Sequence, residues 1–344
     1  MPPVEGGADD RKAWADVLQS YELKFTHNWL YSLLLTGTCM SWKKVIIITG
    51  ILFTVTYVGG YIAMPSQWIA ERTVSIRCNP DAAFRALGPD TVWKNLLSPL
   101  EGLKCVYRVG GKQNRKVELI AETQGGTFSG ILSLLSQSSL DSCIVQWRYV
   151  IPSGGNPFGR IHRMGASLDL TRDMEVMLGH LRDFLEQEKN VYGMEVRGEM
   201  SHDSVLIVKQ WKAAAYPGTT EIYAALAELR AYMVSQRAKE IDPPMLHVQA
   251  GPGGRFEVMT AIPVDRELKG EGDIFLRRFV PWKVLAGEVR GGAYRAEQAG
   301  VQLQYYIQDH QRTSMAIPFQ SLVTERDKEK DSTRWVTRVI EPVF

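Results

Sequence analysis

The chain closes with AIPFQSLVTERDKEKDSTRWVTRVIEPVF, residues 316–344, and this stretch decides the fold of the C-terminal half. Its two ends alternate in side-chain character with a period of two, as half-buried strands do. The charged run 325–331 between them predicts a solvated hairpin tip. In the first strand the alternation turns Gln320 inward. A neutral amide at an inward position raises the question of whether it anchors a ligand.

The same order of elements occurs twice in the C-terminal half. A strand at 204–210, a helix at 220–237 and strands at 243–251 and 255–264 are followed by a strand at 279–292, a helix at 295–311 and the two terminal strands. Each half alone would leave one sheet face and one helix stripe uncovered, so an internal duplication is the economical explanation. We therefore expect an α+β domain of duplicated β-α-β-β units at 200–344.

The N-terminal half contains a second α+β pattern, at 68–192. A strand and an Asn79-Pro80-Asp81 helix start come first, four strand-like runs follow between residues 103 and 151, and a long amphipathic helix begins near residue 170. This order predicts a curved antiparallel sheet wrapped round a helix. Asp169 and Asp173 stand near the expected helix start, so we interpret them as cap and dipole partners rather than as paired catalytic carboxylates.

Residues 45–64 carry no charge and are long enough to cross about 30 Å of hydrocarbon as a helix. We predict a transmembrane helix at 44–65, preceded by a tail and an amphipathic helix within 1–43; a buried helix of a soluble protein is the alternative. The expected interface residues are Trp42, Lys43, Lys44, Tyr61 and Trp68. Basic residues on both flanks leave the orientation open. The prediction is a single-pass protein of the mitochondrial or bacterial inner membrane, with membrane lipid as one partner.

Composition argues against several classes of site. The 40 basic residues are dispersed among 38 acidic ones, for a net charge of +2, so no nucleic-acid partner is expected. The four cysteines show no CxxC spacing and the six histidines form no cluster, so we expect no metal and no cofactor.

Two family resemblances follow from these stretches. TVSIRCNPDAAFRAL at 73–87, with Trp93 soon after, resembles the opening of the START/SRPBCC (polyketide-cyclase-like) superfamily. That resemblance implies a helix-grip fold whose cavity often holds apolar ligands. The stretches 243–264 and 285–307, with the turn RGGAY, resemble the GyrI-like (AraC effector-binding, SOUL-related) family. That family binds small, often cationic or aromatic molecules in a cleft between its two halves, and some members hydrolyse substrates there.

The GyrI-like family commonly uses a glutamate in a strand of the form Pro-aromatic-Glu-x-Tyr. In this chain the strand is Pro318-Phe319-Gln320-Ser321-Leu322, so the acid is replaced by Gln320 and the tyrosine by Leu322. A neutral amide cannot act as a general base or pair with a cation. It is then a relic of a lost function or an anchor for a neutral ligand. Glu325 lies nearby in the turn, so the remaining alternative is that the family's glutamate aligns with Glu325 and not with Gln320. The aromatic candidates for a cleft are Tyr216, Tyr223, Trp282, Tyr294, Tyr305 and Trp335. At most of these positions core packing is an equal alternative.

Three functions are compatible with these features. The first is a non-catalytic, membrane-anchored accessory or scaffold subunit of a membrane complex, such as an organellar energy-transducing complex, with protein subunits as partners. The second is a membrane-tethered sensor or carrier of a small neutral amphiphile or lipid, held as an apolar ligand. The third is a hydrolase of the GyrI-like type, with no catalytic residue identified.

Overall fold

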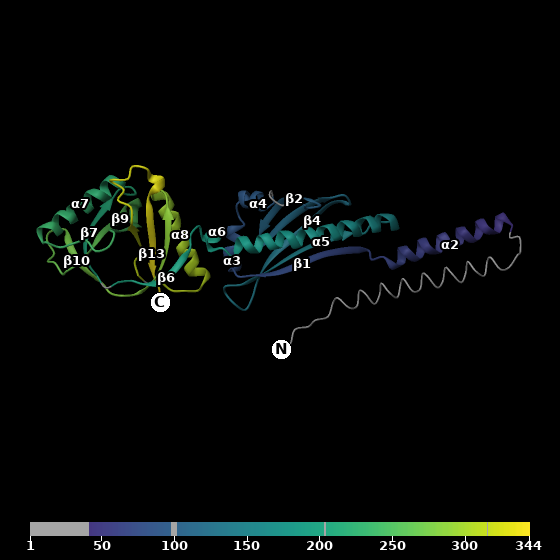
Figure 1. The fold of residues 1–344 in the computed structure, drawn as a ribbon, viewed down its shortest axis with the longest axis horizontal. Coiled ribbons are helices and arrows are strands. Elements are labelled where there is room, and N and C mark those ends of the chain that lie inside the picture. Colours follow the sequence, from purple (N-terminus) through teal and green to yellow (C-terminus); the bar gives the residue numbers. More distant parts are fainter. Residues whose placement is uncertain (1–40, 98–101, 203, 315) are drawn as a thin grey trace. The chain divides into compact units, whose positions relative to one another are not determined.

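The computed structural model describes residues 41–97, 102–202, 204–314 and 316–344, so the amphipathic helix expected within 1–43 lies outside the described residues. The chain divides into two compact units, Met1–Met64 and Pro65–Phe344. The described part of the first unit is the helix α2 (Trp42–Ala63), drawn in purple in Figure 1. Its 22 residues give a length of about 33 Å at 1.5 Å per residue. Within the described chain it is the one helix long and apolar enough to cross a membrane.

The side chains of α2 fit an apolar surrounding. None of them is buried within the chain. The hydroxyls of Thr49, Thr54 and Thr56 each donate to the carbonyl four residues earlier, at 2.8 to 2.9 Å. The other polar side chains between Val45 and Ala63 are those of Tyr57 and Tyr61. Each threonine hydroxyl therefore has an acceptor within the helix, as a segment inside hydrocarbon requires.

The second unit begins with a five-stranded antiparallel sheet in the order β1-β5-β4-β3-β2. Its strands are β1 (Gln67–Ile76), β2 (Val106–Gln113), β3 (Lys116–Thr123), β4 (Gly126–Ser136) and β5 (Cys143–Pro152). The short helices α3 (Pro80–Ala86) and α4 (Asp90–Leu97) follow β1, and the long helix α5 (Pro157–Leu185) covers one face. Asn79 caps α3 by accepting the N–H of Asp81 at 2.9 Å, as its sequence indicates. The expected antiparallel sheet packed on a long helix is confirmed (Figure 1).

The start of α5 differs from the sequence expectation. The helix begins at Pro157, with the Asn156 side chain accepting the N–H of Gly159, and not near residue 170. Our interpretation of Asp169 and Asp173 as cap residues is therefore wrong, because both lie in the helix interior. Asp173 is buried and accepts the backbone N–H groups of Lys104 and Cys105 and the hydroxyl of Tyr107, at 2.9 to 3.1 Å. This carboxylate ties α5 to the start of β2.

The rest of the second unit is an eight-stranded antiparallel sheet in the order β10-β7-β9-β8-β12-β13-β11-β6. The strands are β6 (Val196–Met200), β7 (Ser204–Ala213), β8 (Met245–Ala250), β9 (Phe256–Val264), β10 (Ile274–Phe279), β11 (Lys283–Arg290), β12 (Phe319–Leu322) and β13 (Val336–Pro342). The helices are α7 (Thr219–Ser235) and α8 (Ala293–Asp309), and two 3-10 turns occur at η1 (Pro252–Gly254) and η2 (Ser332–Arg334).

The two halves of this sheet repeat each other, as the sequence predicts. β7, α7, β8 and β9 correspond in order and pairing to β11, α8, β12 and β13. Each half also has a short leading strand that pairs with the other half: β6 joins β11, and β10 joins β7. The duplicated units are therefore clasped together at both edges of the sheet.

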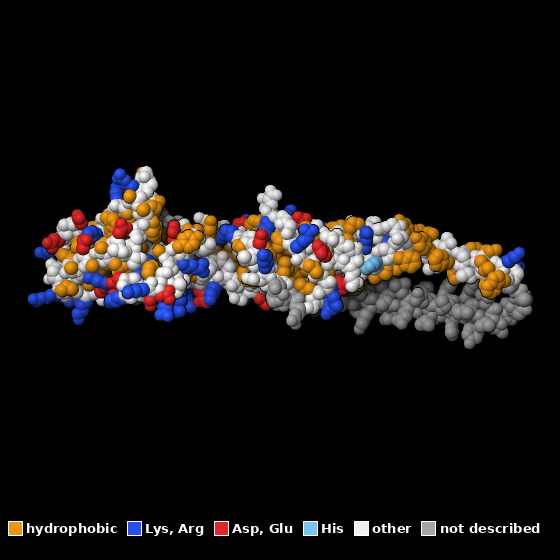
Figure 2. Space-filling model, turned by 90° about the horizontal axis from the view of Figure 1, so that it is seen from above, with side chains coloured by type: hydrophobic (Ala, Val, Ile, Leu, Met, Phe, Trp, Pro, Cys, Tyr) orange, Lys and Arg blue, Asp and Glu red, His pale blue; other side chains and the backbone are white. Residues whose placement is uncertain are grey.

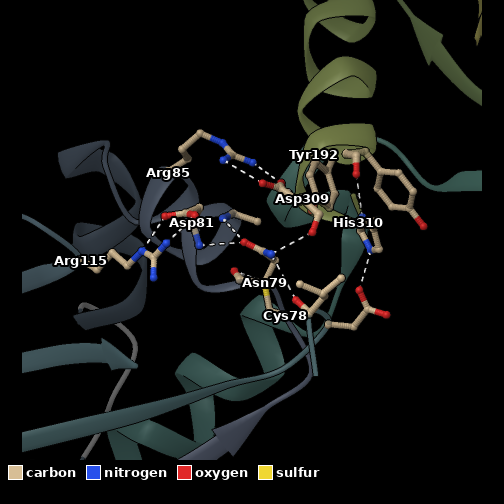
Figure 3. A network of polar contacts seen from close by, with 12 residues as sticks. Cys78, Asn79, Asp81, Arg85, Arg115, Tyr192, Asp309 and His310 are labelled. Atoms are coloured by element: carbon tan, nitrogen blue, oxygen red, sulfur yellow. Dashed lines mark hydrogen bonds and ion pairs between the residues drawn. The ribbon is translucent and has the colours of Figure 1, made fainter. Parts of the chain in front are cut away.

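A continuous apolar core joins the two sheets. It runs from the residues under α5 through Tyr192 of α6 (Glu188–Tyr192) and Met194 to the inner side of α8. Beside it, polar contacts connect α3 to the end of α8 (Figure 3), where the Asn79 side chain donates to the carbonyl of Asp309 at 3.0 Å. Whether the chain is best divided into domains at 192–200 stays a prediction.

Candidate functional site

The eight-stranded sheet is weakest at its centre, where its two halves meet. β8 and β12 share only the register pairs Gln320↔Leu246 and Ser321↔Met245, while the flanking strand pairs are longer. The N–H of Leu322 adds a bond of 2.8 Å to the carbonyl of Pro244. Beyond these contacts the strands are not paired, and a cleft of about 270 Å³ lies over this junction. Ligand clefts commonly form where two structural halves meet.

The cleft lies on the helix-covered face of the sheet. Gln320 is directly opposite Val339, and antiparallel partners point to the same face. Val339 belongs to the core beneath α8, so Gln320 also faces that helix. The inward orientation expected for Gln320 is thereby explained by the strand register. The cleft is lined by Tyr216, Leu246, His247, Val248, Ala250, Phe256, Glu297, Gly300, Val301, Leu303, Gln304, Pro318, Phe319, Gln320, Val339, Ile340 and Glu341.

Tyr216 and Gln320 form the polar part of the cleft nearest the strand junction. The Tyr216 ring packs edge-on against Phe256, with ring centroids 5.8 Å apart. Burial raises the pKa of Tyr216, the nearby carboxylate of Glu297 adds to the rise, and a hydrogen bond with Gln320 opposes it. The hydroxyl therefore stays protonated at neutral pH and is available as a donor or acceptor.

Glu341 is a carboxylate in the same cleft that the sequence analysis missed. It lies two residues after Val339 on β13, so it points to the same face as Gln320. Only 8% of it is exposed; burial raises its pKa, and a hydrogen bond with Ser314 opposes the rise. No described cation forms an ion pair that would offset this burial. One hydroxyl does not neutralise a buried carboxylate, which stays costly unless a positive charge or further donors approach it.

The alternation that places Gln320 inward also places Glu341 inward. In the terminal strand, Thr337, Val339 and Glu341 share one face. That signal was present in the sequence, but the family glutamate position drew attention to the neighbouring strand. The remaining polar lining residues, Glu297 and Gln304 of α8 and His247 of β8, reach the cleft through tertiary packing. His247 is held by the carbonyl of Pro318, 2.7 Å from its Nδ1.

The other predicted aromatics lie elsewhere. Tyr223 donates to the carbonyl of Thr324 at 3.2 Å and accepts the N–H of Arg326 at 2.8 Å. Tyr294 is exposed, and the ring of Tyr305 lies under the guanidinium of Arg85 at 4.5 Å. None of these three lines the cleft.

The two predicted tryptophans contact the C-terminus of the chain and the hairpin tip, respectively. Trp282 donates its indole N–H to the carbonyl of Val343 at 3.0 Å and packs edge-on against Phe344. Trp335 donates to the carbonyl of Glu329 at 2.8 Å, and the guanidinium of Arg326 lies 5.1 Å from its ring centre. Both are structural contacts outside the cleft.

The charged run 325–331 is more structured than a solvated tip. Glu325 forms ion pairs with Arg230 of α7, at 3.1 Å, and with Lys328. It does not line the cleft. Arg326 is buried, and its guanidinium donates to Thr337 at 2.8 Å. The expectation of a wholly solvated tip is wrong for Arg326, whose side chain folds back over the sheet.

The other expected cavity, between the first sheet and α5, is filled. The pocket there has a volume of only about 10 Å³ and is lined by Trp93, Leu96, Leu97, Leu119, Leu132, Trp147, Met177, Leu178 and Leu181. That volume is at the limit for a single water molecule. The described part of this sheet and helix therefore holds a packed core where the resemblance implies a ligand cavity.

The predicted membrane-interface residues fall into two groups. Trp42, Lys43, Lys44 and Tyr61 lie on α2 and are exposed. Trp68 lies on β1, half-buried against the core of the second unit. Among the described residues there is no group of three or more histidine, cysteine, aspartate or glutamate side chains that could hold a metal ion.

No protein-family model matches the chain, and no curated protein matches it. Solved structures similar to its C-terminal part include the C-terminal domain of EcmrR, with 14% identity and a TM-score of 0.38 over 44% of this chain and 98% of that one. A hydrolase from Listeria innocua is 7% identical over 44% of this chain and 92% of its own, with a TM-score of 0.33. SAV2435 bound to tetraphenylphosphonium is 14% identical over 44% and 94%, with a TM-score of 0.31. Likenesses of this size say nothing about the ligand or activity of this chain.

Proposed function

We propose that this protein is a membrane-anchored, non-catalytic binding protein for a small amphipathic molecule. The observation that carries the proposal is the cleft at the junction of β8 and β12, where Glu341 is buried without a cationic partner beside Gln320 and Tyr216. The cleft offers apolar and aromatic walls with a few polar groups, the usual composition of a ligand site. A molecule with an apolar body and a positive charge or a hydrogen-bond donor fits it.

Anchoring by α2 is the second part of the proposal. Its length, its lack of charge between Val45 and Ala63 and its uncovered apolar side chains support a membrane span. The particular membrane, mitochondrial inner or bacterial inner, stays a prediction. The absence of a nucleic-acid partner likewise stays an expectation from the charge balance.

The filled pocket beneath α5 supports a structural role for the first sheet. A rigid module between a membrane helix and a binding domain suits an accessory subunit or a tethered sensor, and less so a lipid carrier. Participation in a larger membrane complex is compatible with this arrangement and stays a prediction.

Isothermal titration of the full-length protein in dodecyl maltoside tests the binding proposal. The probe is benzyltrimethylammonium, a small aromatic cation. We expect saturable binding that Glu341→Gln weakens at least about tenfold, because a charge pair at 4 Å contributes up to about 4 kcal/mol at an effective dielectric near 20. Glu288→Gln is the matched control, since it removes the same charge from an exposed position of β11. Equal weakening in both variants, or no binding by the wild type, would contradict the proposal.

A further inference from the structure

The N-terminal half of α5 carries exposed apolar side chains along one face. Phe158, Ile161, Met164 and Leu168 are 71%, 49%, 39% and 63% exposed. Their spacings of three, three and four residues place them in a single stripe of the helix. We call these four residues the α5 stripe. Water-facing positions of a helix in a soluble protein usually carry polar residues, so this stripe indicates an apolar environment outside the chain.

Charge divides α5 at the same point. Residues 157–168 contain Arg160, His162 and Arg163 and no acidic residue. Residues 169–185 contain four acidic residues together with three basic ones: Asp169, Asp173, Glu175 and Asp183, with Arg172, His180 and Arg182. The first turn has no acid, although acids are favoured at a helix N-terminus. The guanidinium groups of Arg160 and Arg163 donate to the carbonyls of Gly154 and Pro152, which holds them close to the start of the helix. Arg160 is buried, at 7% exposed, and Arg163 is half-buried, so the first three turns of α5 are marked by their exposed apolar stripe and by the lack of acidic residues.

Covalent connectivity limits how far this end of α5 can lie from the end of α2. Only Met64 to Ser66 separate α2 from β1, and the carbonyl of Ser66 accepts the N–H of Ser153 at 3.0 Å. Four residues later α5 begins, at Pro157. Even with both connections fully extended at about 3.6 Å per residue, the chain limits the distance between the two helix ends to about 30 Å.

Two further apolar side chains are exposed on the same end of the second unit. Ile69 and Val150 are 45% and 44% exposed and face each other as a cross-strand pair near the start of β1. Figure 2 shows orange hydrophobic side chains gathered at the end of the second unit where α5 begins. In the described residues, exposed apolar side chains on α5 and on the β1–β5 pair thus lie at the end of the unit that follows α2 in the chain.

We propose that the α5 stripe lies in the headgroup region of the membrane that α2 crosses. Helices with one apolar face bind in this way, with the apolar face at the level of the acyl-chain boundary. The inference rests on the proposed membrane anchoring by α2. It assigns a lipid surface, and not a protein, as the partner of the stripe.

Lipid-attached quenchers test this inference in the full-length chain. The protein, with Cys39→Ser, is labelled with an environment-sensitive nitrobenzoxadiazole dye at Leu168→Cys and reconstituted in vesicles of phosphatidylcholine and phosphatidylglycerol. Val176→Cys, an exposed position two turns further along α5, is the matched control, and Phe53→Cys reports on α2. The other three cysteines are buried. Phosphatidylcholine with a spin label near the headgroup is the quencher.

We expect the dye at residue 168 to lose most of its emission and the dye at residue 176 to keep it. Adding Ile161→Asp to the Leu168→Cys chain should restore the emission, whereas Leu135→Asp, at an exposed leucine of β4, should not. If the dye in α2 is quenched by membrane-centre spin labels and the dye at residue 168 is not quenched, the anchor stands and the inference is overturned. A blue-shifted but unquenched dye at residue 168 also overturns it, since a protein then covers the stripe. Loss of quenching in α2 itself contradicts the anchoring on which the inference rests.

Discussion

Arg85 and Asp309, 224 residues apart in the chain, form an ion pair that joins α3 to the last residue of α8 (Figure 3). Nη1 of the guanidinium lies 3.2 Å from Oδ1 of the carboxylate, and the Tyr192 hydroxyl donates to Oδ2 at 3.0 Å. Asp309 is 8% exposed, so nearly all of its solvation comes from these partners. Because α8 also lines the cleft, this contact links the proposed binding site to the sheet that follows α2.

Removing the carboxylate should destabilise the second unit. We expect Asp309→Ala to lower the free energy of unfolding by about 3 kcal/mol, because the guanidinium and the tyrosine hydroxyl lose their buried acceptor. Glu175→Ala is the control: it breaks the exposed pair with Arg72, at 2.7 Å, and should cost less than about 1 kcal/mol. Urea denaturation followed by circular dichroism measures both, and equal losses would contradict a buried role for Asp309.

Asp173 should be the most sensitive carboxylate of the first sheet and helix. Its substitution by alanine leaves two backbone N–H groups and the Tyr107 hydroxyl without their acceptor. We expect a loss of about 3 kcal/mol or more in the free energy of unfolding. Asp169→Ala, one turn earlier and outside these bonds, should change it by less than about 0.5 kcal/mol. If both variants are equally stable, Asp173 does not tie α5 to β2.

The packed state of the first sheet and α5 predicts a cavity penalty. Leu181 lines the small pocket and is 4% exposed, so Leu181→Ala should cost about 2 to 5 kcal/mol. Val176→Ala, on the exposed side of the same helix, should cost less than about 0.5 kcal/mol. Thermal unfolding compares the two. A mild effect of Leu181→Ala would indicate an open cavity in place of the packed core.

The buried carboxylate of the cleft predicts a pH dependence of stability. Burial raises the pKa of Glu341 from its ordinary 4.5, so the folded chain binds this proton more tightly than the unfolded chain does. The stabilisation is complete below pH 4.5 and is lost as the pH rises through the raised pKa. Glu341→Gln should therefore be more stable than the wild type above that pKa.

A pair of pH titrations checks this sign. The difference in unfolding free energy between Glu341→Gln and the wild type should grow as the pH rises from 4.5 and then level off. Glu288→Gln, which removes a carboxylate from an exposed position of β11, is the comparison variant. A constant difference across the range would mean that Glu341 titrates normally.

The sequence predicts the duplicated sheet because two different periods, two for the strands and 3.6 for the helices, recur in the same order. It does not predict the edge strands β6 and β10. Each is short and pairs with the opposite half, and a pairing between distant segments leaves no local pattern. The start of α5 was missed for another reason. Two glycines between Asn156 and Asp169, Gly159 and Gly165, obscure the helical period, although Asn156 followed by Pro157 is a favourable helix start.

The candidate site could be predicted only in part. Alternation within a strand identifies the inward direction of Gln320, and the same rule would have identified Glu341. It cannot tell which loop or helix residue reaches the same space. Tyr216 lines the cleft while Tyr294 is exposed to solvent, and only the packing of α7 and α8 on the sheet separates them.

Native mass spectrometry of the protein, extracted gently from its own membrane, tests the central claim most directly. We predict a chain that carries a small bound mass, which is retained by Glu288→Gln and lost or strongly reduced in Glu341→Gln. That mass would also identify the ligand. A bare wild-type chain, or a fixed assembly of subunits in which neither variant changes any small bound mass, would contradict the account of this protein as a membrane-anchored small-molecule binder.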